Sequence, residues 1–259
     1  MKRALLLLIP AVLIVAPVPR FELQAGEPFE PPSLEHWFGT DDLGRDMLAG
    51  AIEGARLSLL VGSGTAFLAL LLGTLVGVSA GFAGGIWDEI LMRIVEVFQV
   101  VPRFFLALVV LTIWDYDVWR LVAVLGLTSW GGLARLARAE TLSIKEREFV
   151  VAARASAARR PRLLCRHLLP FAMRPLLAVA PLIASGAMLT EAGLSFLGLG
   201  ALEHVSWGYL LQNAQPFLRD AWWMAVFPGL MMTAVVLVLA LVALLGKSDV
   251  VTSLHPVRS

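Results

Sequence analysis

Three carboxylates lie close together near the start of the chain, and Asp41, Asp42 and Asp46 could together bind a hard cation. A calcium loop needs ligands at alternating positions, and this spacing does not supply them. A structural role is simpler, because Thr40 or Asp41 can cap a helix that begins near Leu43. Arg45 can then pair with a neighbouring carboxylate. We therefore predict no metal site in this segment.

A second polar set interrupts an apolar stretch, where Arg93, Glu96 and Gln99 share one face of a helix because they are spaced by three. Charges inside a membrane are costly and normally face protein or water. These residues either line a pore or gate, or Arg93 and Glu96 form an intrahelical pair near the helix end, which we favour. Arg103, after Pro102, lies deeper and is our candidate for a pore-facing charge.

The elements that must position these residues are apolar helices. Of the 259 residues, 58% are hydrophobic and only 16% are charged, and the mean hydropathy is +0.79. Soluble domains carry about 25% charged residues. The chain is therefore predicted to be an all-α integral membrane protein. A net charge of +1 gives no attraction to nucleic acid, the single Cys165 excludes an internal disulfide, and the four histidines are scattered.

The apolar residues form long runs, and a helix needs about 20 of them to cross a bilayer. Five runs reach or approach that length: Leu57–Phe82, Ile90–Ile113, Trp119–Leu136, Phe171–Thr190 and Trp222–Leu245. A shorter run, Ala4–Val18, follows Lys2 and Arg3 and is similar to a secretory signal peptide. No clean cleavage site precedes a soluble domain, and further spans follow, so we interpret it as an uncleaved first span.

The distribution of charge predicts the orientation of these spans, because Lys and Arg resist translocation. Residues 134–174 hold ten basic side chains against three acidic ones, whereas residues 19–56 hold eight acidic side chains against three basic ones. Residues 191–220 are also poor in basic side chains. The first segment is therefore predicted to be cytoplasmic and the other two external. Six transmembrane helices with both termini in the cytoplasm satisfy all three placements.

This topology divides the chain into four parts. Residues 1–18 form the first transmembrane helix, and residues 19–56 form an external linker with an amphipathic segment. Residues 57–246 form a five-helix core that contains a cytoplasmic loop over residues 137–170. Residues 247–259 form a cytoplasmic tail.

The basic loop has a pattern that retention in the cytoplasm does not explain. Lys145–Arg160 is rich in alanine and other good helix formers. Pro161 is predicted to stop this helix, a second short helix covers Arg162–Leu169, and Pro170 precedes the next span. A helical hairpin with one face of small residues lets a partner surface approach closely. We therefore interpret the loop as a docking element.

The loop sequence carries a family resemblance. It reads REFVVAARA over residues 147–155 and HLLP over residues 167–170, which resembles the "EAA" loop of ABC importer permeases. Val151 replaces the glutamate of the family triplet, and Ala157 stands where a glycine is usual. Glu148 lies one helical turn before Val151, so an acidic contact is expected to persist there.

Other segments resemble one branch of these permeases, the dipeptide/oligopeptide/nickel family. Residues 39–46 read GTDDLGRD, residues 54–59 read GARLSL and residues 191–200 read EAGLSFLGLG, in the order of the family. The chain is most similar to the C-type of the two paired subunits. The residues that carry the first signature are Gly39, Thr40, Asp41, Gly44, Arg45 and Asp46.

The resemblance implies a type I, MetI-like permease fold in the inner membrane of a prokaryote. It implies a heterodimeric pore with a second permease, two cytoplasmic ATPases and an extracytoplasmic substrate-binding protein. The chain has no phosphate-binding loop of the form GxxxxGK[ST], so ATP and Mg are expected on the partners, and we expect neither enzymatic activity nor a cofactor in this chain. The implied coupling residues are Arg147, Glu148, Val151, Ala152, Ala153, Arg154, Ala157, Leu169 and Pro170.

Two other classes of function remain open. An intramembrane enzyme would use Glu96 or the exposed carboxylates, but it needs a second catalytic group at the same depth, which the other spans do not offer. A membrane scaffold would need only to anchor a partner, and six spans exceed that requirement. The motifs do not separate peptides from nickel or related solutes as the cargo.

Overall fold

The computed structural model describes residues 21, 25–114, 116–156, 159–200 and 204–254, and these form helices and connections without a named strand. The elements in chain order are α2 (Met47–Ala83), α3 (Gly85–Val100), α4 (Arg103–Trp114), α5 (Val118–Lys145), α6 (Glu148–Ala155), α7 (Arg160–Leu163), the π-helical turn η1 (Leu164–Leu168), α8 (Leu169–Leu194), the π-helical turn η2 (Ser195–Leu199), α9 (Trp207–Ala214), the 3₁₀ turn η3 (Gln215–Phe217) and α10 (Trp223–Leu254). The predicted all-α class is confirmed.

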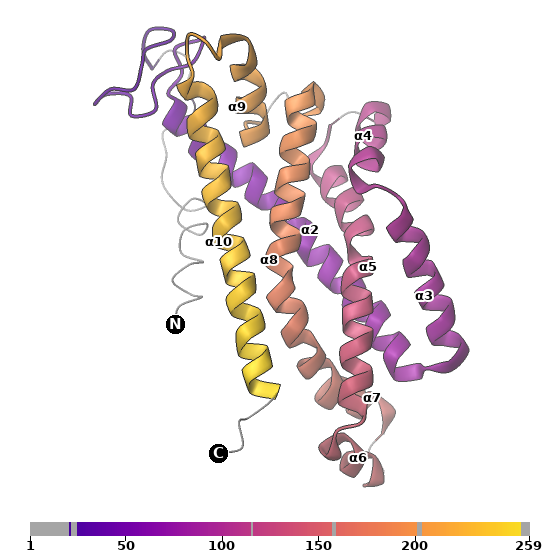
Figure 1. Ribbon diagram of the computed structural model, residues 1–259. Helices are drawn as coiled ribbons and strands as arrows, with labels where there is room; N and C mark the ends of the chain where they lie inside the picture. Colours follow the sequence, from indigo (N-terminus) through magenta and orange to yellow (C-terminus); the bar gives the residue numbers. More distant parts are fainter. Residues whose placement is uncertain (1–20, 22–24, 115, 157–158, 201–203, 255–259) are drawn as a thin grey trace.

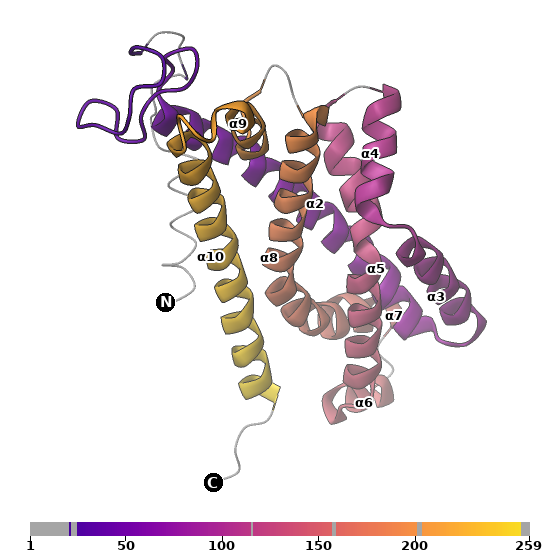
Figure 2. The same cartoon turned by 45° about the horizontal axis from the view of Figure 1, so that its top comes forward.

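The long helices run between two ends of the molecule. Helices α2, α5, α8 and α10 and the pair α3–α4 extend from one end toward the other (Figure 1). Residues 25–46 and α9 lie together at one end, which we call the signature end. Helices α6 and α7 lie at the opposite end, which we call the loop end; Figure 2 shows the same arrangement from a second direction.

Three described helices are long and apolar enough to cross a membrane: Met47–Ala83, Leu169–Leu199 and Trp223–Gly246. The bent pair α3–α4 makes a fourth if it is one span. Helix α5 is long enough but carries several charged residues in its C-terminal half. The first predicted span, residues 1–18, lies outside the described residues. The count of six spans, and the assignment of cytoplasmic and external sides, therefore stay predictions.

The predicted continuous span Ile90–Ile113 is wrong, because the helix breaks in its middle. Helices α3 and α4 meet at an angle of 71°. Val101, between them, has extended backbone angles (φ −76°, ψ 120°), as expected for a residue that precedes proline. Pro102 also lacks the N–H group that a continuous helix would need. The break lies between the two ends of the bundle (Figure 1).

The segment Glu191–Gly200, which carries one of the family motifs, lies at the end of a long helix. Helix α8 contains Pro175 and Pro181 and continues into η2, so that Leu169–Leu199 is one apolar unit of 31 residues. Its end is marked by Gly198, whose φ of 84° favours glycine. Glu191 in this unit is fully buried.

Helices α2 and α5 pack closely through a stripe of glycines. Gly73, Gly77 and Gly81 recur every four residues on α2 and face residues 130–141 of α5. A Cβ atom built on Gly73 would lie 2.6 Å from the Cβ of Leu133, and one on Gly77 would meet the carbonyl oxygen of Ala134. Small residues at this spacing allow two helix backbones to approach closely within a membrane.

A methyl group on this stripe is expected to destabilise the bundle. Gly77→Ala should lower the free energy of unfolding by about 1–3 kcal/mol, because it overpacks a backbone contact. Gly186→Ala is the matched control, since a Cβ atom at Gly186 meets nothing within 4 Å. Thermal unfolding of both purified variants in detergent measures the difference. Equal melting temperatures would show that α2 and α5 do not pack through the glycines.

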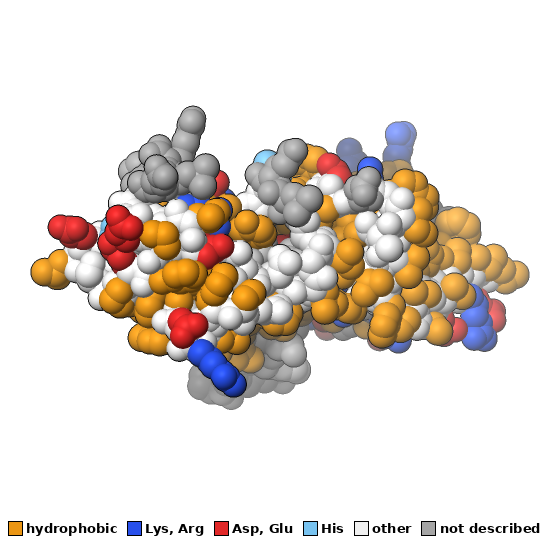
Figure 3. All heavy atoms as spheres, turned by 90° about the horizontal axis from the view of Figure 1, so that it is seen from above, with side chains coloured by type: hydrophobic (Ala, Val, Ile, Leu, Met, Phe, Trp, Pro, Cys, Tyr) orange, Lys and Arg blue, Asp and Glu red, His pale blue; other side chains and the backbone are white. Residues whose placement is uncertain are grey.

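The outer surface of the bundle is strongly apolar. Large hydrophobic side chains stay exposed on α2, α3–α4 and α10, among them Phe67 at 70%, Val97 at 66% and Leu244 at 62%. Hydrophobic side chains are spread over much of the surface seen from the signature end (Figure 3). Exposed apolar area of this extent marks a surface that contacts lipid or another protein. It agrees with an integral membrane protein.

Candidate functional site

The predicted docking loop forms a short helix rather than a long one. The single helix predicted over Lys145–Arg160 is wrong, because α5 ends at Lys145 and α6 covers only Glu148–Ala155. Glu148 lies in the first turn of α6, where a negative charge favours the helix dipole. Pro161 lies in the first turn of α7 and does not stop a helix there; proline is tolerated in a first turn because that N–H has no helical partner.

One side of α6 is anchored to the bundle. Val150 is fully buried in a cluster with Ile144 of α5 and with Leu163 and Leu168 from the segment before α8. The rings of Phe149 and Phe171 lie 5.3 Å apart, a distance typical of aromatic packing. The loop is therefore held to the ends of α5 and α8 by apolar contacts.

The other side of α6 is free to meet a partner. Glu148, Val151 and Ala152 are exposed, whereas Ala153 is half-buried against the apolar cluster. Of the remaining predicted coupling residues, Arg147 and Leu169 are half-buried and Pro170 is exposed. The side chain of Arg154 and all of Ala157 lie outside the described structure. The exposed part of the predicted set thus forms a patch around the small residue Ala152.

Polar contacts that the sequence analysis missed join the end of α5 to the turn between α2 and α3. Arg138 donates two hydrogen bonds to Asp88, at 2.6 and 2.7 Å. Lys145 Nζ donates to the carbonyl oxygens of Gly81 and Phe82, at 3.0 and 3.3 Å. A bidentate arginine–carboxylate pair fixes geometry as well as charge. These contacts tie the end of α5 to both α2 and α3.

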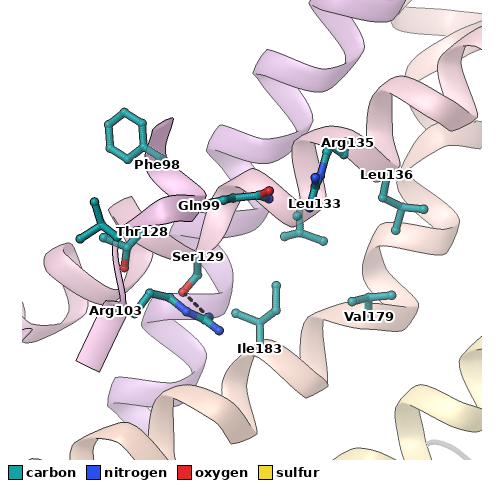
Figure 4. A pocket seen from close by; sticks show the side chains of 12 residues that line it. Phe98, Gln99, Arg103, Thr128, Ser129, Leu133, Arg135, Leu136, Val179 and Ile183 are labelled. Atoms are coloured by element: carbon teal, nitrogen blue, oxygen red, sulfur yellow. Dashed lines mark hydrogen bonds between the residues drawn. The ribbon is translucent and has the colours of Figure 1, made fainter. Parts of the chain in front are cut away.

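A cavity of about 550 Å³ opens at the break between α3 and α4. Two of the predicted pore residues, Gln99 and Arg103, line it, together with Ser129 and Arg135 of α5. Leu133, Val179 and Ile183 supply apolar lining from α5 and α8 (Figure 4). Arg103 donates a hydrogen bond of 3.2 Å to Ser129 Oγ. The structure thus brings Arg103 and Gln99 to one concave surface.

The third predicted pore residue, Glu96, faces a different cavity. This second cavity, of about 410 Å³, lies toward the N-terminal end of α3 and shares Arg135 with the first. Glu96 accepts a hydrogen bond of 3.0 Å from Arg93, and the two side chains are 55% and 72% exposed. The favoured intrahelical pair is confirmed. Because both groups face solvent, the pair contributes only about 0–1 kcal/mol.

Two neighbouring glycines of α5 shape the first cavity in opposite ways. A Cβ atom on Gly131 would lie 3.0 Å from the side chain of Gln99, which therefore rests against the helix. A Cβ atom on Gly132, which lines the cavity, would meet nothing within 4 Å. Gly131 thus positions Gln99, and Gly132 keeps the cavity wide.

The family signature forms a compact turn at the signature end. Gly39 and Gly44 have φ values of 72° and 73°, which L-residues with a side chain rarely adopt. Thr40 Oγ1 donates to the carbonyl oxygen of Glu27, and Trp223 Nε1 donates to the carbonyl oxygen of Thr40 at 2.9 Å. The turn is thereby tied to the start of α10.

Asp41 and Asp46 organise this turn through hydrogen bonds to neighbouring groups. The buried Asp41 accepts hydrogen bonds from the backbone N–H and the Nε–H of Arg45, at 2.8 and 2.6 Å, which confirms the predicted pairing of Arg45. The predicted helix start near Leu43 is wrong. Asp46 is the N-cap, accepting from the N–H of Ala49 at 2.9 Å, and α2 begins one residue later. These carboxylates therefore have structural partners.

A buried carboxylate lies where α8 meets α2. Glu191 accepts hydrogen bonds from Ser58 Oγ at 3.1 Å and from Ser195 Oγ at 2.7 Å. Sequence reasoning missed this contact because it used Glu191 only as a charge that helps to set topology. The available signal was the spacing of Glu191 and Ser195, which puts both on one face of a helix. The cluster links α2 to α8 through a polar contact within an apolar core.

Comparison with known sequences identifies one protein family. Residues 73–247 match the family described as binding-protein-dependent transport system inner membrane component. The oligopeptide transport system permease protein OppC of Bacillus subtilis is 37% identical over 201 residues, which cover 77% of this chain and 66% of that protein. The dipeptide transport system permease protein DppC of the same organism is 37% identical, covering 77% of this chain and 63% of that protein.

A putative peptide permease protein of Brucella suis is 41% identical over 201 residues, which cover 76% of this chain and 67% of that protein. The match thus spans 63 to 66% of the two Bacillus relatives. Among solved structures, a chain of the MetNI methionine ABC transporter in an inward-facing conformation aligns with a TM-score of 0.61 at 20% identity, over 79% of this chain and 96% of that chain. This similarity supports the predicted MetI-like fold.

Proposed function

Since this chain belongs to the family of binding-protein-dependent transport system inner membrane components, we propose that it is a permease subunit of an ATP-driven importer for peptides or related small solutes. Its similarity to relatives named as oligopeptide and dipeptide permeases supports peptides over nickel. The chain is a multi-pass protein of the inner membrane.

The partners in this proposal are a second permease, two cytoplasmic ATPases and an extracytoplasmic binding protein. The exposed apolar side chains of α2 and α3–α4 provide surface for lipid and for a second permease. The chain catalyses no reaction itself, and ATP and Mg bind to the ATPases.

The observation that carries the proposal is that one side of α6 is buried against the bundle while the other side is exposed. Val150 anchors this helix to the bundle while Ala152 is exposed, so a partner can bind to the exposed side of the helix. The Arg138–Asp88 pair and Lys145 then connect the loop to the turn between α2 and α3. Closure of the ATPases would move α6, and these polar contacts would carry the movement to the helices around the cavity.

Two alternative functions have weaker support. An intramembrane enzyme would depend on Glu96, which faces solvent and pairs with Arg93. A passive scaffold would not need the cavity or the polar connections of the loop to α2 and α3. Neither alternative requires an ATPase partner.

Co-purification tests the proposal. The affinity-tagged chain, extracted from its own cells in a mild detergent, should bring down a second permease and ATPase chains that carry the GxxxxGK[ST] motif. Mass spectrometry of the complex identifies them. A chain that purifies without any ATPase would contradict the coupling role.

Narrowing the cavity is expected to block transport without releasing the ATPases. Gly132→Leu should lower the rate of ATP-driven peptide uptake at least about tenfold, because its side chain would project into the first cavity. Gly132→Ala is the graded control and should change uptake by less than about twofold, since one methyl group meets no neighbour. Equal uptake by both variants would place the solute pathway elsewhere.

A further inference from the structure

Two arginines and no described carboxylate line the first cavity; Arg135 also borders the second cavity, which Asp88, Glu89 and Glu96 line. We propose that Arg103 and Arg135, assisted by Gln99, form a subsite that binds a carboxylate group of the transported solute. The inference rests on the proposed import function and assigns a chemical preference to its pathway.

The two guanidinium groups approach the cavity from different elements. Arg103 is the first residue of α4, directly after the break, and Arg135 belongs to α5. Figure 4 shows Arg103 with Ser129 on one side of the cavity and Arg135 on another, around the apolar residue Leu133. No Asp or Glu is among the described residues that line this cavity.

Three other arginines of the described structure are paired with carboxylates. Arg45 binds Asp41, Arg138 binds Asp88 and Arg93 binds Glu96. Within the described residues, neither Arg103 nor Arg135 has an ion pair; Arg103 has only the neutral Ser129 as its hydrogen-bond acceptor. Most of the planar donor fork of each guanidinium is therefore available.

The location makes this charge functional. Charged side chains in membrane-embedded regions are costly, and they normally face a water-filled path and bind a partner there. A guanidinium group binds a carboxylate through two parallel hydrogen bonds, and Gln99 can donate a third from its amide. Positive charge on both sides of one concave surface thus favours an anion.

A terminal carboxylate fits this subsite better than a side-chain group. Every linear peptide ends in a carboxylate, whatever its side chains are. A subsite for that group would therefore hold peptides of different sequence in one orientation. The apolar lining from Leu133, Val179 and Ile183 would leave the rest of the peptide without specific contacts.

The experiment compares two probes in proteoliposomes that contain the complete transporter and its binding protein. The probes are radiolabelled tri-alanine, which has a carboxylate, and tri-alanine amide, which does not. Arg103→Gln and Arg135→Gln should each lower uptake of tri-alanine about tenfold or more and change uptake of the amide less than about twofold. For each probe, the rate of uptake by the variant is divided by the rate of uptake by the wild type. This ratio cancels any preference of the binding protein for one probe, because the same binding protein is used with the variant and with the wild type.

Arg93→Gln is the matched control, because Arg93 borders only the second cavity and pairs with Glu96. Uptake of each probe by the Arg93→Gln variant should stay within about twofold of uptake by the wild type. An equal loss of both probes in the Arg103 and Arg135 variants would overturn the proposal and assign these arginines to a carboxylate of another subunit. Unchanged uptake of both probes would overturn it as well.

A lipid headgroup is the other source of an anion, and the bilayer composition separates the two. The ratio of variant to wild-type uptake of tri-alanine should be the same in vesicles of phosphatidylcholine alone as in vesicles that also contain phosphatidylglycerol. A defect that appears only with the anionic lipid would assign the arginines to headgroups and overturn the subsite. If wild-type vesicles take up neither probe with ATP, the proposed peptide import fails. If they take up tri-alanine, but the ratio of variant to wild-type uptake is the same for tri-alanine and for its amide, only the subsite fails.

Discussion

Replacing Ala152 with arginine is expected to abolish stable binding of the ATPases and to lower ATP-driven uptake at least about tenfold. Ala152 is exposed on α6, opposite the side that Val150 anchors. A long charged side chain would hold the partner surface away at the centre of the docking patch, where single substitutions cost about 2 kcal/mol or more. Co-purification of the ATPases and uptake by the complex measure the two effects.

Two controls separate docking from folding in this experiment. Ala152→Ser keeps a small side chain and should retain ATPase binding within about twofold. The Ala152→Arg chain should also keep the melting temperature of the wild type, because the side chain projects into solvent. Normal ATPase recovery with Ala152→Arg would contradict the assignment of α6 as the docking helix.

Removing the carboxylate of Asp41 is expected to cause the largest loss of stability. The Asp41 side chain is 1% exposed and accepts hydrogen bonds from Arg45 and from the backbone N–H groups of Leu43 and Arg45. Asp41→Ala leaves the Arg45 guanidinium, which is 12% exposed, without its carboxylate. Breaking a buried pair in this way costs about 3–5 kcal/mol.

Glu96→Ala is the matched control, because it removes one partner of an exposed pair. That variant should lose no more than about 1 kcal/mol. Melting temperatures of the purified chain in detergent, with the wild type alongside, measure both changes. Similar losses in the two variants would show that burial of Asp41 does not decide the strength of its contacts.

The apolar helices could largely be predicted from the sequence, because length and hydropathy act locally. Helices α2 and α10 contain the runs that were assigned as spans. The break at Val101 was missed, although the restriction that Pro102 imposes on the preceding residue is a local signal. The helix start at Met47 was also missed, because Thr40, Asp41 and Asp46 are all suitable caps and only tertiary contacts select among them.

The residues around the candidate site were only partly predictable. Arg103 and Gln99 could be singled out because a polar or charged residue in an apolar run is visible in the sequence. In the structure both line one cavity. Arg135 was counted only as one of the basic residues that set topology, since nothing local shows that α5 brings it to the cavity that Arg103 lines. The division of α6 into a buried Val150 and an exposed Ala152 likewise follows from packing against α5 and α8.

The most direct test of the account is ATP-driven uptake by the purified complex. Proteoliposomes containing this chain, its second permease, the ATPases and the binding protein are loaded with ATP on the ATPase side, and accumulation of radiolabelled tri-alanine is followed with time. The account predicts accumulation that requires both ATP and the binding protein and that is lost when ADP replaces ATP. Accumulation that is the same with ADP, or none with ATP, would contradict the proposed role of this chain as a permease subunit.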